Sequence, residues 1–360
     1  MVETWRLLDC SSVDPKMDLA INEAIFRSRR ENLTPNTLRL WQGPASVIIG
    51  SGSSYKDDIN QEECRKYGVA VIRAISVAGD PFYMDKGSLN FAVTANAALF
   101  NTRTKDYPPV LSDYSILNSA IVEGLRKFSD TFEADADGIH ISGRRMTGIL
   151  PKWFHDFLLF QGTLLVNTDM DVYSRVIKTE RSTEKKLMIT SLSRQLGRDV
   201  SIDETKTALI EGFEKKLGIV FKLKKELTGD EQKSANLLYR AKYSLEKWNV
   251  HGIEPFLVGM GKASLEVFVA YPPTSMCRQL IELVKDVTSD LQDDITVRVW
   301  MRGKGINQHG VYPELSSALV DAEKCSRIPA IIINGELKFD KTLPSRECLR
   351  SAVVAALPQE

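Results

Sequence analysis

The strongest constraint on the fold is a long apolar stretch near the middle of the chain. Residues 157–166, FLLFQGTLLV, are mainly apolar and predict a buried strand or pair of strands. The polar segment SGRRMTG, residues 142–148, precedes this stretch, and NTDMDVYSRVIK, residues 167–178, follows it. From the residues alone, Arg144 and Arg145 can be interpreted as a solvated pair on a hairpin beside the buried strand.

Length and composition bound the class of protein. A chain of 360 residues exceeds one ordinary core and predicts two or more domains. Its hydrophobic content of 43% and charged content of 26% are typical of a soluble globular protein. Basic and acidic residues both number 47, so no global charge attracts nucleic acid or an anionic membrane.

Several further features predict a cytoplasmic protein. The five cysteines are scattered and odd in number, which argues for a reducing compartment instead of a disulfide framework. No apolar run approaches the length of a membrane span, and the N-terminus lacks the layout of a signal peptide. The four histidines show no metal-ligand pattern, so we expect no metal site built from them.

Helix and strand signals alternate through the first 250 residues. Asp14 can cap a helix that begins at Pro15. Apolar or alternating runs predict three strands, at residues 37–41, 45–50 and 69–73. Helical spacing or capping pairs predict three more helices, which begin near Tyr114, Ser201 and Thr228. This order predicts an α+β fold, a mixed β-sheet flanked by helices and followed by a mostly helical segment.

The pattern changes after residue 250. Gly252–Gly261 is expected to be a linker. Beyond it we expect strands at 264–270 and 295–300, a hairpin over 328–339, and helices after Pro272, at 314–324 and at 346–356. This β-α-β-α-β-β-α order resembles the thioredoxin fold, in which Pro329 stands at the position of a cis-proline.

In the thioredoxin fold the first strand-to-helix turn carries Cys-x-x-Cys, but here it reads Thr274-Ser-Met-Cys277. Redox exchange between two local thiols is therefore excluded. Cys277 is either a thiol with some thiolate character at a helix N-terminus or a buried, inert residue. Pairing with Cys325, which precedes Pro329, is a third interpretation. Thr274, Cys277 and Pro329 form the candidate site of this region, which we expect to bind extended peptide or a thiol-bearing arm.

The first 250 residues resemble the lipoate–protein ligases, enzymes that attach lipoyl groups to lysines. The segments that carry this resemblance are Met17–Ala24, Leu38–Gly50, Ile59–Arg73, Arg73–Asn90, Ser142–Gly148 and Gln161–Lys178. The resemblance implies a ligase-like catalytic domain over 1–180 and an accessory helical segment over 181–250. A linker over 251–261 and a thioredoxin-like α/β domain over 262–360 would complete the chain.

The family motifs locate the implied site. The family usually has x-Gly-Lys-Lys-Ile-Ser-Gly, in which the second lysine does the chemistry, and here that position is Arg145. The family loop RRxxGGGxVYHDxGxLN corresponds to RAISVAGDPFYMDKGSLN, from Arg73 to Asn90. Such glycines let backbone N–H groups approach the acyl chain and phosphate. Here the glycine triplet is reduced to Ala78-Gly79-Asp80, and Gln161 replaces a histidine.

The resemblance implies Arg145 as the catalytic residue, with a permanent cation that can stabilise an oxyanion. Substrate or nucleotide binding is implied for a further set: Arg73, Gly79, Tyr83, Asp85, Asn90, Asp137, Gly148, Gly162 and Thr163. Octanoyltransferases of the same superfamily use a nucleophilic cysteine. No cysteine lies between Cys64 and Cys277, which argues against that route.

The resemblance implies ATP and Mg²⁺, with lipoate or octanoate as the substrate. The implied partners are a lipoyl-domain carrier protein and a second ligase-family subunit; neither nucleic acid nor membrane is expected. Three functions remain open. The chain is an acyl-adenylate-forming ligase, a catalytically degenerate paralogue that binds lipoyl proteins or a ligase partner, or a scaffold. Loss of the glycine triplet favours the second function, whereas retention of Tyr83, Asp85 and Asn90 favours a site of ligase shape.

Overall fold

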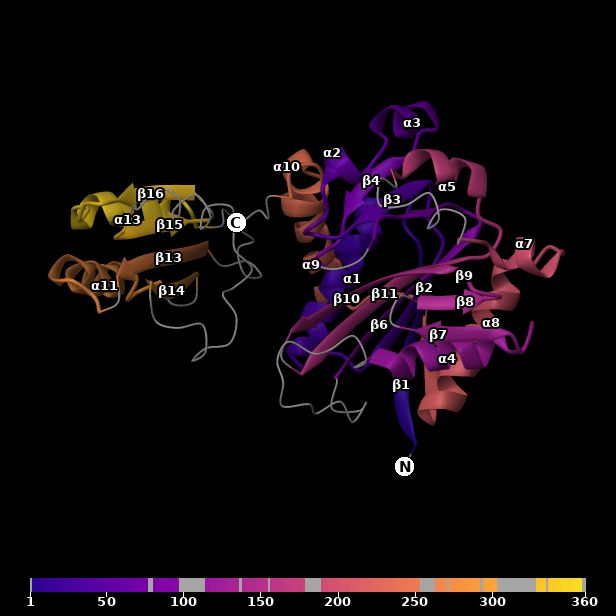
Figure 1. The fold of residues 1–360 in the computed structure, drawn as a ribbon. Coiled ribbons are helices and arrows are strands. Elements are labelled where there is room, and N and C mark those ends of the chain that lie inside the picture. Colours follow the sequence, from indigo (N-terminus) through magenta and orange to yellow (C-terminus); the bar gives the residue numbers. More distant parts are fainter. Residues whose placement is uncertain are drawn as a thin grey trace. The chain divides into compact units, whose positions relative to one another are not determined.

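The computed structural model describes residues 2–76, 80–96, 114–135, 138–154, 156–178, 189–252, 263–270, 272–291, 294–302, 328–334 and 336–357 (Figure 1). The chain divides into two compact units, Met1–Gly252 and Ile253–Glu360. Several predicted features lie outside the described residues: Gly79, Asp137, Cys325, the helix at 314–324 and most of the linker.

The first unit is built on a six-stranded mixed sheet. Its order is β10 (Thr147–Phe154), β11 (Phe157–Leu165), β6 (Ser88–Asn96), β2 (Thr37–Trp41), β1 (Glu3–Asp9) and β12 (Ile219–Lys224). β1 runs parallel to β2 and β12, and the other neighbours are antiparallel. The apolar stretch predicted as a buried strand is β11, and the α+β class is confirmed.

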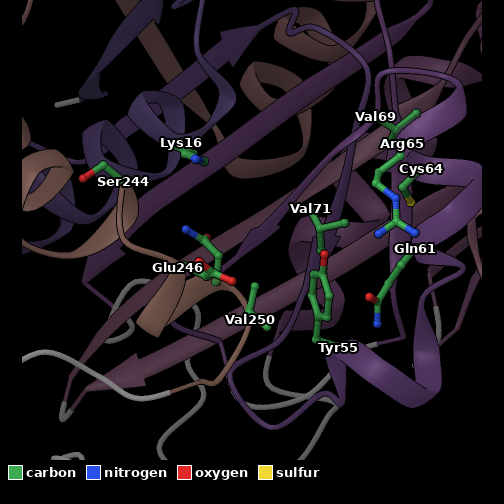
Figure 2. Close-up of a pocket in the computed structure, with 11 residues that line it drawn as sticks. Lys16, Tyr55, Gln61, Cys64, Arg65, Val69, Val71, Ser244, Glu246 and Val250 are labelled. Carbon is green, nitrogen blue, oxygen red and sulfur yellow. The ribbon is translucent and has the colours of Figure 1, made fainter.

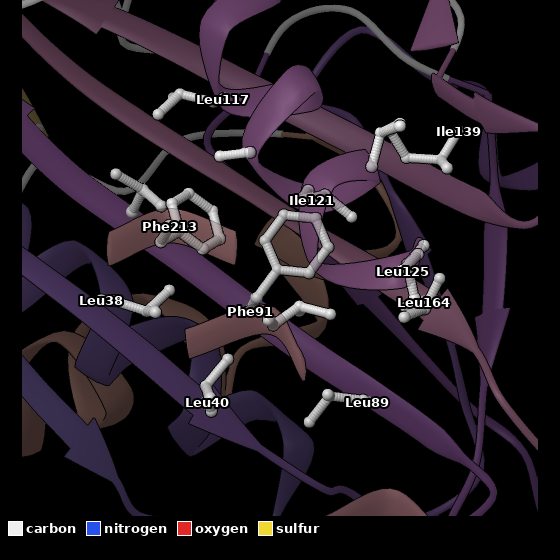
Figure 3. Close-up of a cluster of buried hydrophobic side chains, with 14 of the residues drawn as sticks. Leu38, Leu40, Leu89, Phe91, Leu117, Ile121, Leu125, Ile139, Leu164 and Phe213 are labelled. Atoms are coloured by element: carbon white, nitrogen blue, oxygen red, sulfur yellow. The ribbon is translucent and has the colours of Figure 1, made fainter. Parts of the chain in front are cut away.

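Two helices, α4 (Ser115–Leu125) and α8 (Ile202–Leu217), cover one face of this sheet. Their apolar residues join those of the strands in the main core (Figure 3). The helices approach each other to backbone contact: a methyl group on Gly212 would lie 2.4 Å from the carbonyl oxygen of Ala120 and from the Gly124 nitrogen. Small residues at this crossing are what allow α8 to sit against α4.

Helix α1 (Pro15–Arg30) packs on the opposite face. Asp14 caps it by accepting from the Lys16 N–H at 2.9 Å, as the sequence predicts. α1 is tied to a helical run, α9 (Gly229–Leu238), η3 (Tyr239–Tyr243) and α10 (Glu246–Asn249). The connection is made by a buried cluster in which the Glu23 carboxylate accepts hydrogen bonds from Lys242 Nζ at 3.2 Å and from the Tyr243 hydroxyl at 2.7 Å.

Smaller sheets and short helices complete the unit. One three-stranded sheet has the order β4 (Ala70–Arg73), β3 (Ser46–Ile49), β5 (Phe82–Met84), and another has β7 (Phe132–Asp135), β8 (Gly138–Ile141), β9 (Arg144–Arg145). The short helices are α2 (Tyr55–Asp58), α3 (Gln61–Lys66), α5 (Met170–Val176) and α7 (Leu192–Leu196).

The structure differs from the expected boundary at residue 180. The segment expected to be accessory contributes α8 to the main core and β12 to the main sheet, where β12 pairs with β1. Arg6 of β1 also forms a buried, bidentate ion pair with Glu231 of α9, at 2.6 and 2.8 Å. The described part of 181–250 thus belongs to the same unit as residues 1–178.

The second unit has a sheet of order β14 (Ile295–Arg302), β13 (Ala263–Ala270), β15 (Ala330–Ile333), β16 (Glu336–Asp340). β13 is parallel to β14 and antiparallel to β15. Helices α11 (Ser275–Val287) and α13 (Arg346–Val354) share a core with β13 and β15. The Ile328–Pro329 peptide bond is cis, as expected. The assignment of this unit to the thioredoxin fold stays a prediction. None of the helices in the described ranges is both long and apolar enough for a bilayer span.

Candidate functional site

Three predicted site residues, Asn90, Thr163 and Gly148, form one row across the main sheet together with Trp41. Trp41 of β2 pairs with Asn90 of β6, Asn90 pairs with Thr163 of β11, and Thr163 pairs with Gly148 of β10. Residues directly opposite each other on neighbouring strands point to the same face. Leu19 of α1 lines the same pocket as Trp41 and Thr163, so this is the face that α1 covers.

A buried chain of hydrogen bonds runs along the next row. The Arg39 guanidinium donates to Asn22 Oδ1 at 2.7 Å, and the Asn22 amide donates to Gln161 Oε1 at 2.9 Å. The Gln161 amide in turn donates to Ser76 Oγ at 3.4 Å. Asn22 lies on α1 and Gln161 on β11, so this polar chain fixes the helix above the sheet.

The two rows border a small pocket with mostly apolar walls. It is lined by Leu19, Trp41, Ile48, Phe82, Gly148, Leu150, Gln161, Gly162 and Thr163. It leaves ≈ 10 Å³ for the centre of a water molecule, which is room for about one water. Apolar walls with few polar groups suit an acyl chain. The structure therefore brings together three predicted residues, Gly148, Gly162 and Thr163, in one pocket wall.

Two buried donors of the row that borders this pocket, one on Trp41, which lines it, and one on Asn90, which does not, have no hydrogen-bond partner among the described residues. They are Asn90 Nδ2 and Trp41 Nε1. The other end of the Asn90 amide is occupied, because Thr163 Oγ1 donates to Asn90 Oδ1 at 2.7 Å. A buried unpaired donor costs free energy. These two nitrogens are therefore available to an acceptor on a ligand or to an ordered water.

Phe82 closes one side of the pocket. The ring rests directly on Gly148, since a methyl group built there would lie 2.1 Å from Phe82 Cγ. The side chain is buried, with 2% exposure. Phe82 stands where the family motif has valine. Gly148 thus provides the space that the larger ring occupies.

Arg145 lies beyond Phe82. Its guanidinium carbon is 5.8 Å from the Phe82 ring centroid, and its Nη2 is 3.5 Å from the Asp80 carboxylate. Burial raises the pKa of the Tyr173 hydroxyl, while Arg145, which forms a hydrogen bond with it, opposes that rise. The expected catalytic cation is therefore half-buried behind Phe82 and does not itself line the pocket, and the Asp80 carboxylate partly neutralises its charge.

Tyr83 and Asp85 hold the loop to α5 and do not line the pocket. Asp85 accepts from the backbone N–H groups of Gly87 at 2.8 Å and Asp169 at 2.9 Å. Burial raises the pKa of the Tyr83 hydroxyl, and the neighbouring Asp85 carboxylate raises it further. Both residues position the segment that carries Phe82.

Arg73 is fully occupied by the protein. Its guanidinium donates to the carbonyl oxygens of Gly50 at 2.7 Å, Ser53 at 2.8 Å and Trp248 at 3.0 Å. It is 1% exposed. Arg73 was expected to bind substrate or nucleotide, and in the structure it joins α10 to the 50–53 turn.

A separate pocket of about 210 Å³ lies among α2, α3, β4 and α10 (Figure 2). Lys16, Tyr55, Cys64, Arg65 and Glu246 are among its lining residues. Burial raises the pKa of the Cys64 thiol to about 11, which keeps it protonated near neutral pH. None of the predicted site residues lines this pocket.

In the second unit, Thr274 caps α11 by accepting from the Cys277 N–H at 3.2 Å. Cys277 is 1% exposed and packs in that unit's core. Of the interpretations of Cys277, the structure supports the buried residue. Its proposed pairing with Cys325 lies outside the described residues.

The chain matches the model of the lipoyl protein ligase A/B catalytic domain over residues 14–214, more than half of its length. The chain belongs to this family. Lipoate-protein ligase A subunit 1 of Thermoplasma acidophilum is 29% identical over 251 residues, covering 65% of this chain and 92% of that protein. The octanoyltransferase LipM of Anoxybacillus flavithermus is 24% identical over 280 residues, covering 69% and 98%.

Solved structures agree with this membership. A crystal structure of lipoate-protein ligase A bound with ATP has a TM-score of 0.60 and 27% identity, covering 70% of this chain and 100% of that one. A structure from the bipartite lipoate protein ligase system of T. acidophilum has a TM-score of 0.62 and 26% identity, covering 71% and 100%. The similarity to these ligases spans about the length of the first unit.

Some residues near the site lie inside the segments that resemble the family, but the motifs did not single them out. Asn22, Trp41 and Tyr173 lie in Met17–Ala24, Leu38–Gly50 and Gln161–Lys178, and only the strand register and the packing show their place at the site. Phe82 lay inside the quoted loop. Phenylalanine is larger than the valine that the motif has at this position, and that difference could have been noticed from the sequence alone.

Proposed function

We propose that this chain handles a lipoyl or octanoyl group, holding the acyl chain between α1, the main sheet and β5. The proposal rests on the pocket lined by Trp41, Phe82, Gly148 and Thr163, whose walls are mostly apolar and include the unpaired indole nitrogen of Trp41. The relatives named above are lipoate ligases and octanoyltransferases, which supports an acyl group as the ligand.

The chemistry proposed is that of an ATP-dependent ligase. The acid's carboxylate oxygen bonds to the α-phosphorus of ATP, pyrophosphate leaves, and a lysine amine of a lipoyl domain then attacks the acyl carbonyl as AMP departs. Arg145 would stabilise the negative charge on carbonyl and phosphate, because its cation is permanent and can bind oxygen pairs. A phosphate would have to displace Asp80, which now lies 3.5 Å from Arg145.

The described residues do not by themselves assign ligands to Mg²⁺. Among the described residues, no group of three or more His, Cys, Asp or Glu side chains could hold a metal ion. Asp137, which the family motif implicates in nucleotide and metal binding, lies outside them. Mg²⁺ therefore enters this proposal only as the usual companion of ATP, with no residue assigned to it.

A second function has a specific observation in its favour. Arg145 replaces the catalytic lysine and is already neighboured by the Asp80 carboxylate and Tyr173. A degenerate paralogue that binds a lipoyl domain or a ligase subunit without chemistry would tolerate both features. The bipartite ligase of T. acidophilum makes a second ligase-family subunit a plausible partner.

One assay separates the two functions. Purified protein is mixed with ATP, MgCl₂, octanoate or lipoate, and a lipoyl domain, and the intact mass of the lipoyl domain is measured. Ligase activity adds one acyl group at a lysine and is lost in Arg145→Ala, whereas Arg145→Lys keeps or improves it. An unmodified lipoyl domain that nevertheless binds the protein in calorimetry would establish the second function instead.

A further inference from the structure

Phe82 is one of the two aromatic side chains that line the pocket proposed for the acyl chain. It lines the pocket together with Trp41 on another wall, and the aliphatic side chains of Leu19, Ile48 and Leu150 fill the remaining sides. The space left holds about one water. Any acyl chain must therefore enter by displacing a side chain of the wall.

Phe82 is also held in place from several directions. Its backbone pairs with Ile48 in the β3–β5 ladder. Its ring makes an edge contact with Tyr173, with centroids 5.6 Å apart, and lies 5.8 Å from the Arg145 guanidinium carbon. On the sheet side it rests on Gly148, where even a methyl group would collide. A well-packed ring with these contacts yields little space to a bulky ligand.

The shape of the ligand then decides how far the wall must move. A straight alkyl chain is slim along its whole length, whereas a lipoyl tail ends in a five-membered dithiolane ring. We expect a slim chain to pass beside the Phe82 ring with a small shift, whereas the wider dithiolane ring would require the Phe82 ring to move further.

Resting on the proposed function, we propose that Phe82 is the specificity-determining residue of this site and selects a straight saturated acyl chain, such as octanoyl, over the ring-bearing lipoyl group. The substitution Phe82→Val leaves empty the space that the ring fills beside Gly148, so the preference for octanoyl over lipoyl should be lost. One extra or missing methylene group in an apolar pocket is worth about 10- to 200-fold in discrimination, so we expect a change of at least about tenfold.

The test is the binding of octanoate and of R-lipoate to the full chain, measured by calorimetry. The variants are Phe82→Val and the control Phe213→Val. Phe213 is a fully buried phenylalanine of α8 in the main core, away from the residues that line the pocket. Circular dichroism first shows that each variant is folded.

The unmodified protein should bind octanoate at least about tenfold more tightly than lipoate. Phe82→Val should lose most of that ratio through tighter lipoate binding, and Phe213→Val should keep it. Equal affinities or a preference for lipoate in the unmodified protein would overturn the inference even if the variant fails to fold. An unchanged ratio in folded Phe82→Val would also overturn it. Failure of the proposed function looks different, because then neither acid binds to any of the proteins.

Discussion

At the scale of single residues, the site depends on Gly148, whose missing side chain leaves room for the Phe82 ring. Gly148 is the second residue of β10, and glycine within a strand usually weakens it. Its lack of a side chain admits the Phe82 ring, and a methyl group there would lie 2.1 Å from Phe82 Cγ. The ring cannot retreat easily, since Tyr173 and Ile48 contact it from the other sides.

Gly148→Ala should therefore destabilise the protein by about 1–3 kcal/mol, the usual cost of overpacking a filled core. Gly229→Ala serves as the control, because a methyl group at this first residue of α9 meets nothing within 4 Å. The control should be neutral or stabilising by up to about 1 kcal/mol, since alanine restricts the unfolded chain. Urea denaturation of both variants measures the difference, and equal midpoints would contradict the packing described.

At the scale of elements, α1 and the η3–α10 run are joined by charges with almost no access to water. Burial alone would raise the pKa of Glu23, but Lys242, Arg27 and the Tyr243 hydroxyl together lower it to about 2. Lys242 is 0% exposed, and its Nζ also lies 4.2 Å from the Trp248 ring centroid. The cluster therefore needs Glu23 ionised.

This lowered pKa sets a direction for acid unfolding. A carboxyl whose folded pKa lies below its unfolded value of 4.5 contributes stability above about pH 4.5, and that stability is lost as the pH falls towards about 2. Glu23→Gln should be strongly destabilised at pH 7, by about 3–5 kcal/mol, because it removes the charge of a carboxylate that is buried beside the Lys242 cation. The difference in free energy of unfolding between this variant and the unmodified protein should become smaller below pH 4.5.

Denaturant unfolding at several pH values measures the difference in free energy of unfolding between Glu23→Gln and the unmodified protein. Glu226→Gln, at an exposed position, is the control and should follow the unmodified protein at every pH. A difference for Glu23→Gln that stays constant from pH 7 to pH 3 would refute the account of the cluster.

Capping residues and hydrophobic spacing predicted most of these helices and strands. What they did not predict depends on pairing between strands that are far apart in the sequence. Asp14 caps α1, Thr228 and Glu231 form a capping box on α9, and both are properties of neighbouring residues. β12 lies beside β1 although more than two hundred residues separate them, so its place in the main sheet left no local trace. The row from Trp41 to Gly148 depends on the register of four strands, which motif spacing does not encode.

At the scale of the whole molecule, the chain joins two units that each have their own core. The first contains the family's catalytic fold, and the second has a four-stranded sheet and a core in which Cys277 of α11 is buried. The thioredoxin fold of the second unit stays a prediction from its sequence, and under that prediction its role is binding, since Thr274 cannot supply the attacking thiolate.

The full chain should therefore not reduce insulin disulfides in the presence of dithiothreitol beyond the rate of the reagent alone. Exposed Cys348 should react with a thiol reagent before buried Cys277 does. Insulin turnover that disappears in Cys277→Ser would show that the buried thiol is redox-active after all.

The central claim is that an acyl chain lies on the α1 face of the main sheet, between Leu19, Trp41, Phe82 and Thr163. The most direct measurement is photo-crosslinking of the full chain with a straight-chain octanoate analogue that carries a terminal diazirine, followed by peptide mass mapping. We predict saturable labelling, blocked by excess octanoate, in peptides from α1, β2, β5 or β11. Labelling confined to the α4–α8 face or to the second unit, or labelling that octanoate does not block, would contradict the account.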